Sequence, residues 1–312
     1  MMDRTDRHER FFLRTLSKEM LLYTEMIHAN AVIHGNTDEL LKYNKQEHPL
    51  AIQLGGGDAS ILRDASIIAE NQGYDEINLN VGCPSPRVQS GDFGAILMKK
   101  PKLVSSCLLA MKNSVDIPVT VKCRIGVDDM DEKKDLSDFI NIVKDSGCNT
   151  FIIHARKAWL KGLSPKDNRE IPPLNYKRVY ELKEEFPELE IILNGGITST
   201  EQSSEHLNYV DGVMLGRHAY DNPYSLIEVD EVFFNHKERK ETRTDVLKNL
   251  IPYLEEEYSQ GNKLGYVTKH LMGLFKGTKY AKKTRSILAT IDNEKAPIQS
   301  ILLLISEIEE SC

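Results

Sequence analysis

The stretch Asn78-Leu79-Asn80-Val81-Gly82-Cys83-Pro84-Ser85-Pro86-Arg87 decides how the rest of the chain is interpreted. Its first half predicts a strand, because apolar residues at 77, 79 and 81 alternate with two asparagines. The strand ends at Gly82, and two prolines stiffen the loop that carries Cys83. Barrels of alternating strands and helices place their chemistry on such loops. Free cysteines are also among the most buried residues, so a catalytic and a buried Cys83 both stay open at this point.

The same unit, a short strand followed by a helix or loop, recurs along the first two thirds of the chain. Seven strands are expected, at 22–26, 50–54, 77–81, 119–123, 151–154, 190–193 and 212–215. This alternation predicts a parallel sheet with helical crossovers. Gln53, Lys122 and His154 put polar groups on one strand face, whereas a doubly wound sheet has nearly continuous apolar strands. We therefore expect an α/β fold of the (β/α)8 TIM-barrel class.

The pattern changes after about residue 221. Residues 223–312 carry no strand signature, and segments 247–258, 264–274 and 297–308 have the apolar spacing of helices. We expect a barrel domain over residues 1–222 and an all-helical domain over residues 223–312.

The composition indicates a soluble protein of the cytoplasm. No apolar run is long enough to cross a bilayer, and no signal-peptide pattern opens the chain, so we expect no membrane partner. The five cysteines show no CxxC pairing, which argues against zinc and against a disulfide framework. We therefore expect no metal and a reducing compartment.

The charge distribution leaves the question of a nucleic-acid partner open. A net charge of −7 argues mildly against one, because phosphate binding favours a positive surface. Residues 276–285, however, carry five basic residues and no acid, and residues 155–169 carry five basic residues and one acid. These segments fit either a polyanionic partner or ordinary solvated lysines.

The last two expected strands end in segments suited to phosphate. Asn194-Gly195-Gly196 follows one strand and Gly216-Arg217 the next. In barrels, the loops after the last two strands commonly bind phosphate through backbone N–H groups. Glycine allows close approach and Arg217 adds a charged donor. Each segment alone is also compatible with a simple turn, but together they favour a phosphate-bearing ligand.

Three polar residues are expected at the tops of earlier strands: Gln53, Lys122 and His154. A lysine that points into a barrel needs an acceptor partner, since a buried unpaired ammonium is costly. A flavin ring offers such acceptors. Lys122 could instead pair with Glu25, and His154 could be a satisfied core residue.

Five segments of the chain together resemble the tRNA-dihydrouridine synthases, in particular the DusA-like subfamily. They read NLNVGCPSPRVQSGDFGAILM, VTVKCRIGVDD, HARKAWLKGLSPKDNREIPPLNY, LNGGI and VMLGRHAYDNPY. The resemblance runs from residue 1 to about 224 and continues more weakly through the helical tail. It implies an FMN-containing oxidoreductase that reduces D-loop uridines of tRNA, around U20 and U20a, to 5,6-dihydrouridine. It also implies NADPH as the reductant of the flavin, and we expect a monomer.

The resemblance assigns roles to individual residues. Cys83 matches the catalytic residue that donates a proton to C5 of the uracil, while hydride reaches C6 from the flavin. Such a reduction needs a hydride donor at one carbon and a general acid at the other. The positions that match flavin contacts are Met1, Met2, Gln53, Lys122, His154, Asn194, Gly195, Gly196, Gly216 and Arg217.

The positions that resemble tRNA contacts are Asn80, Lys166, Asp167, Arg169, Glu170, Lys282 and Arg285. Asn80 matches a position near the substrate base, and the others fall in or beside the two basic segments. A base inside folded RNA has to be flipped out to enter a barrel.

One departure from the family pattern concerns the first strand. In the family a strand precedes the Met-Met-Asp motif, whereas this chain begins with it, so the first strand is expected to be truncated and FMN binding weak. Two other functions therefore stay open. One is a non-catalytic tRNA-binding remnant, and the other is an FMN barrel that reduces a free pyrimidine, which would need neither basic segment.

Overall fold

The computed structural model describes residues 1–86, 88, 91–237 and 239–311. The chain divides into two compact units. The first contains residues 1–2, 21–43 and 48–216, and the second contains residues 3–20, residues 44–47 and the chain from Arg217 onward.

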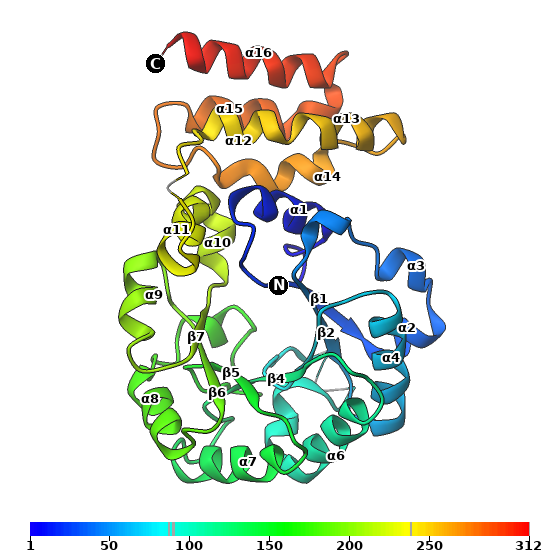
Figure 1. The fold of residues 1–312 in the computed structure, drawn as a ribbon, viewed down its shortest axis with the longest axis vertical. Helices are drawn as coiled ribbons and strands as arrows, with labels where there is room; N and C mark the ends of the chain where they lie inside the picture. The colour runs from blue at the N-terminus through cyan, green and yellow to red at the C-terminus, as the bar shows by residue number, and fades with distance from the viewer. Residues whose placement is uncertain (87, 89–90, 238, 312) are drawn as a thin grey trace. The chain divides into compact units, whose positions relative to one another are not determined.

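The first unit is built on a parallel sheet of seven strands. The strands are β1 (Leu22–His28), β2 (Leu50–Gly55), β3 (Glu76–Asn80), β4 (Val119–Arg124), β5 (Thr150–His154), β6 (Glu190–Asn194) and β7 (Gly212–Met214). Their order in the sheet is their order in the chain, and every neighbouring pair is parallel. The sheet curls, and α4, α6, α7, α8 and α9 lie on its outer side (Figure 1). The expected TIM-like α/β fold is confirmed.

Helices and short turns connect the strands of the first unit. They are α2 (Ala29–His34), α3 (Thr37–Leu40), α4 (Ala59–Asn71), η2 (Gly94–Lys99), α6 (Pro101–Lys112), α7 (Lys134–Lys144), η3 (Asp167–Arg169), α8 (Tyr176–Glu185) and α9 (Thr200–His206). Local capping explains where several of them begin. Asp58, for example, accepts hydrogen bonds from the backbone N–H groups of Ser60 and Ile61 at the start of α4.

The strand alternation sorts side chains between two environments. Ile52, Leu79, Val121 and Ile153 are fully buried. Polar side chains occupy alternate positions near the carboxyl ends of the same strands, and parallel register places them side by side, as for Asn80 and Lys122. All strands point the same way, so their polar carboxyl ends gather at one edge of the sheet.

The second unit is helical throughout its described residues. Its elements are α1 (Arg7–Leu16), η1 (Lys45–Glu47), α10 (Arg217–Asp221), η4 (Pro223–Glu228), α11 (Val229–Phe234), α12 (Arg243–Asn249), α13 (Ile251–Ser259), α14 (Gly265–Thr268), η5 (Lys269–Gly273), α15 (Ala281–Ala289), η6 (Ile291–Asn293) and α16 (Pro297–Glu310).

The boundaries of the two units differ from the expected division at residue 222. Helix α1 belongs to the helical unit because its charged side chains pair there: Arg7 binds Glu257 at 2.5 Å, and buried Arg10 binds Glu47 at 2.6 Å. Arg7 and Glu257 are separated by 250 positions in the chain. No local sequence pattern reports a pairing over that distance.

Candidate functional site

Cys83 lies on a tightly held turn just beyond β3. The side-chain oxygen of Asn80 accepts hydrogen bonds from the backbone N–H groups of Gly82, at 3.1 Å, and Cys83, at 3.0 Å. On the other side, the Cys83 carbonyl accepts from Ala95 N–H at 2.9 Å. The backbone position of Cys83 is therefore set by both flanking segments.

Accessibility separates Cys83 from the other described cysteines. Cys107, Cys123 and Cys148 are fully buried, whereas Cys83 is partly exposed. Burial raises the pKa of Cys107 to about 11 and that of Cys123 to about 12, which makes both thiols inert. Among the described cysteines, Cys83 therefore has the best access to a substrate.

A chain of amide hydrogen bonds connects Asn80 to the barrel interior. Asn80 Nδ2 donates to Gln53 Oε1 at 2.8 Å, and Gln53 Nε2 donates to Asn78 Oδ1 at 2.9 Å. Asn78 Nδ2 in turn donates to Thr120 Oγ1 at 2.8 Å. The structure thus brings two predicted site residues, Gln53 and Asn80, into direct contact. Each amide nitrogen carries two N–H donors, of which these bonds use one.

This series of hydrogen bonds ends inside the barrel at the carboxyl group of Glu76. Glu76 accepts from the hydroxyls of Thr120 and Tyr23, each at 2.7 Å. Burial raises the pKa of Glu76, because a carboxylate loses its hydration there. The interior polar network is therefore satisfied from the Cys83 turn down to the start of β3, which holds the site rigid.

Lys122 and Asn194 are two further predicted site residues at the carboxyl ends of the strands. Lys122 Nζ donates to Asn194 Oδ1 at 2.8 Å, and Asn194 Nδ2 donates to the Met214 carbonyl at 2.7 Å. Within the described residues, Lys122 forms no ion pair with Glu25, the partner considered as an alternative. Burial, together with the nearby charge of Arg124, lowers the pKa of Lys122 to about 8. A cation bonded to a neutral amide is suited to a ligand that brings acceptor atoms.

His154 packs against a glycine turn at the end of β6. Gly195 has φ +118°, and a side chain there would meet His154 Cδ2 at 2.6 Å. Gly196 has φ +73°, and a side chain there would meet Leu174 Cδ1 at 2.5 Å. Both positions require glycine for conformation and for packing. The predicted contacts His154, Gly195 and Gly196 are thus adjacent to one another.

Gly216 occupies a more open place after β7. A Cβ atom there would meet only the Sδ atom of Met1, at 3.8 Å. Met2, the other predicted methionine contact, is more than half exposed. Arg217 follows Gly216 in the chain and begins α10 of the second unit. The backbone of Gly216 in the first unit is therefore open enough to fit the close approach of a flavin phosphate.

Comparison with known proteins identifies the family. The model of the family "Dihydrouridine synthase (Dus)" matches residues 1–309. The chain belongs to the dihydrouridine synthase family. It is 52% identical over 289 residues to a tRNA-dihydrouridine(20/20a) synthase of Synechocystis sp., covering 93% of this chain and 86% of the relative. It is 54% identical over 290 residues to the enzyme of the same name from Escherichia coli K12, covering 93% and 84%.

Among solved structures, a 2-naphthoyl-CoA reductase in complex with 2-naphthoyl-CoA shares the fold, with a TM-score of 0.55 and 9% sequence identity. The match covers 73% of this chain and 47% of that one. In the part of this Dus-family chain that the structure describes, no helix is long and apolar enough to span a membrane. The same residues contain no group of three or more potential metal ligands.

The predicted tRNA contacts of this Dus-family chain fall on two surfaces. Lys166, Arg169 and Glu170 are exposed in the loop after β5, while Asp167 accepts from the N–H and hydroxyl of Ser164 within the same loop. In the second unit, α15 presents two exposed predicted contacts on one face, at i and i+3. These are Lys282 and Arg285.

Arg124 is a site residue that the sequence prediction missed. It is buried at the end of β4, and its Nε atom donates to the Gly82 carbonyl at 2.9 Å. Its NH1 atom donates to the carbonyls of Lys157, at 3.1 Å, and Asn168, at 3.0 Å. One guanidinium thus joins the Cys83 turn to the loop after β5. The sequence signal that could have identified Arg124 is its position two residues after Lys122, which places both side chains on the same face of the strand.

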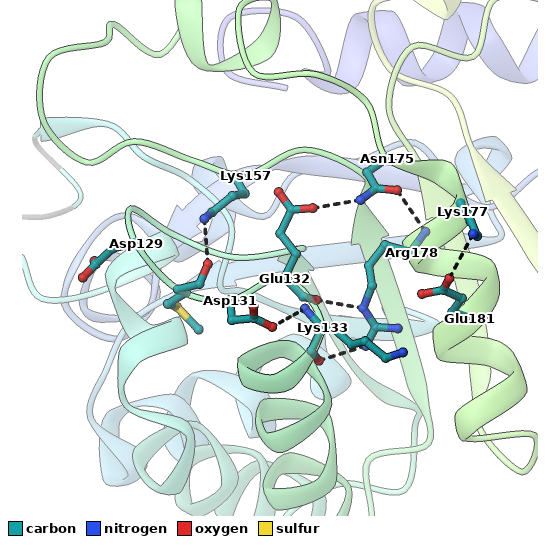
Figure 2. Close-up of a pocket in the computed structure, with 10 residues that line it drawn as sticks. Asp129, Asp131, Glu132, Lys133, Lys157, Asn175, Lys177, Arg178 and Glu181 are labelled. Atoms are coloured by element: carbon teal, nitrogen blue, oxygen red, sulfur yellow. Dashed lines mark hydrogen bonds and ion pairs between the residues drawn. The ribbon is translucent and has the colours of Figure 1, made fainter.

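A surface cavity of about 590 Å³ is lined by residues other than the predicted site residues (Figure 2). Its lining contains four basic and four acidic side chains. They largely bond among themselves and to the backbone, as when Arg178 Nε donates to the Glu132 carbonyl at 2.8 Å. The lining residues are Asp129, Met130, Asp131, Glu132, Lys133, Lys157, Asn175, Lys177, Arg178 and Glu181, and none of them is a predicted site residue.

Proposed function

We propose that this chain reduces uridines of the tRNA D-loop, at about positions 20 and 20a, to 5,6-dihydrouridine, with FMN as cofactor and NADPH as reductant. The observation that carries the proposal is the accessible thiol of Cys83 on a rigid turn, within a chain 52–54% identical to tRNA-dihydrouridine(20/20a) synthases. We further propose a cytoplasmic monomer.

FMN would be held by groups at the carboxyl ends of the strands. Lys122, His154 and Gln53 would face the ring, and the glycine segments after β6 and β7 would receive the phosphate. When bound, FMN supplies the hydride for C6 of the uracil. The roles of Met1, Met2 and Arg217 stay predictions of the same proposal.

Cys83 would protonate C5 of the uracil, so that one proton and one hydride saturate the C5–C6 bond. The Asn80 side chain fixes the backbone of the thiol-bearing turn, and Arg124 fixes the Gly82 carbonyl beside it. The backbone that carries the thiol is thus held in place before substrate arrives, which lowers the entropy cost of proton transfer.

The uridine would have to leave the RNA stack to reach this turn. Asn80 lies beside the thiol and has one amide N–H available for a base carbonyl. Lys166 and Arg169 would bind phosphates near the site, with Asp167 and Glu170 shaping the same loop. Lys282 and Arg285 would serve as further phosphate contacts.

The test is the absorbance spectrum of purified protein supplied with FMN. We expect flavin bands that bleach on adding NADPH and return on adding unmodified tRNA transcript. In Cys83→Ala, NADPH bleaching should remain, while the return with tRNA slows by at least about a hundredfold. Protein that cannot be loaded with FMN but binds tRNA would indicate a non-catalytic binder. A return with free uridine as fast as with tRNA would indicate a free-pyrimidine reductase.

A further inference from the structure

The chain contains one tryptophan, and it is exposed next to the proposed site. Trp159 lies in the loop that follows β5, and 43% of its surface is accessible. A single exposed apolar residue needs no explanation by itself. Three further observations distinguish Trp159.

First, the backbone of Trp159 is locked. Asn168 is fully buried, and its side chain bonds both backbone groups of Trp159, accepting from N–H at 2.7 Å and donating to the carbonyl at 2.9 Å. The neighbours are also held: Ala158 N–H donates to the Gly126 carbonyl, and Leu160 N–H donates to Asp128. An exposed indole on a backbone this well fixed keeps its position without a partner, so binding costs little ordering entropy.

Second, the surroundings of the indole are basic. Lys157 Nζ lies 5.8 Å from the centre of the ring. Lys161, Lys166 and Arg169 are exposed on the same loop. A flat aromatic ring among cations is the combination that binds single-stranded nucleic acid, because bases stack while phosphates pair with the charges.

Third, the loop is coupled to the Cys83 turn. The buried guanidinium of Arg124 bonds the carbonyls of Lys157 and Asn168, which bracket Trp159, and also the carbonyl of Gly82. The backbone around Trp159 is therefore joined to the backbone of the Cys83 turn.

We propose that Trp159 is a stacking platform for an unpaired base of the tRNA, a neighbour of the uridine that enters the barrel. The inference rests on the proposed function and names a contact that none of the predicted tRNA-binding positions includes. Stacking of the neighbouring base would hold the RNA open while the uridine occupies the site.

The single tryptophan makes the test direct. Because all indole emission comes from Trp159, tRNA transcript added to wild-type protein should quench the emission, and the quenching should saturate at the dissociation constant measured separately with end-labelled tRNA. Double-stranded RNA of equal length should quench much less, because its bases are already stacked.

Variants separate stacking from charge. Trp159→Ala should weaken tRNA binding about tenfold at every salt concentration, whereas Trp159→Phe should lose less, since it keeps an aromatic face. Lys161→Gln should lower the slope of log affinity against log salt, which Trp159→Ala should leave unchanged. Tyr209→Ala is the matched control, because Tyr209 is a comparably exposed aromatic residue before β7, at the opposite end of the strands. It should bind like wild type.

The outcomes distinguish this inference from the proposed function. Two results would contradict the stacking role of Trp159 and leave the proposed function unaffected. One is wild-type protein that binds tRNA with unchanged emission, and the other is Trp159→Ala that folds and binds tRNA as wild type does. Wild-type protein that does not bind tRNA would overturn both. If Trp159→Ala fails to fold, the emission quenching of wild type and the tRNA affinity of Trp159→Phe still test whether Trp159 stacks on a base.

Discussion

At the scale of single residues, the site depends on side chains that organise backbone. Asn80 was expected to lie near the substrate base, and its oxygen is instead committed to the N–H groups of Gly82 and Cys83. The substrate role, which would use the remaining amide N–H, stays a prediction. An asparagine two or three residues before a turn commonly bonds the backbone in this way.

We predict that Asn80→Ala lowers the single-turnover rate of dihydrouridine formation by roughly tenfold to a hundredfold, because the turn that carries the thiol is no longer held in place. The free energy of unfolding should fall by about 1–2 kcal/mol, since two backbone donors lose their partner. Asn80→Asp is the control that keeps the acceptor but cannot donate to Gln53. Equal losses of stability in both variants would contradict the turn-holding role.

At the scale of elements, one buried arginine connects loops from two strands. Arg124 donates to carbonyls on the β3 turn and on the loop after β5, and burial lowers its pKa to about 10. Burial costs an arginine hydration, which the carbonyl bonds replace.

We predict that Arg124→Met lowers the free energy of unfolding by about 2–4 kcal/mol, because three carbonyls lose a charged donor. Proteolysis within the loop 156–171 should become faster, which limited digestion measures. Arg63→Met is the matched control, since Arg63 is a half-exposed arginine paired with Asp64 on the surface of α4. If the two variants unfold alike in urea, Arg124 has no organising role.

At the scale of the whole molecule, the helical unit gathers buried titratable groups around α1. His8 Nδ1 lies 2.8 Å from the Tyr253 hydroxyl, and buried His270 lies 2.9 Å from Asp6. Burial, with the charge of Arg7, lowers the pKa of His8 to about 4 from its ordinary 6.5. Burial raises the pKa of Glu9. The helical unit should therefore respond to acid.

The sign follows from proton counting. Between pH 6.5 and 4 the unfolded chain binds a proton at His8 that the folded chain does not, so His8 makes stability fall as pH drops through this window. Glu9 acts in the opposite direction, because its raised pKa lets the folded chain hold a proton that the unfolded chain releases.

We predict that His8→Asn, which can still bond Tyr253, removes up to about 3 kcal/mol of this acid-dependent loss of stability. The measurement is urea unfolding of both proteins at pH 7 and pH 4.5, compared as a difference so that Glu9 cancels. His34→Asn, at an exposed position, should behave like wild type. If the difference in the free energy of unfolding between His8→Asn and wild type does not change with pH, protonation of His8 is not the cause of the acid sensitivity.

The sequence by itself determined the β/α alternation, the seven strands and the polar groups at their carboxyl ends. Alternation and strand-end turns are local, so contiguous residues such as 77–83 carry them completely. Only the tertiary structure decided that α1 joins the C-terminal helices, that Arg124 bonds two loops, and that Asn168 locks Trp159. Each of these depends on burial and on hydrogen-bond partners that lie dozens to hundreds of residues away or within an irregular loop, where no periodic pattern records them.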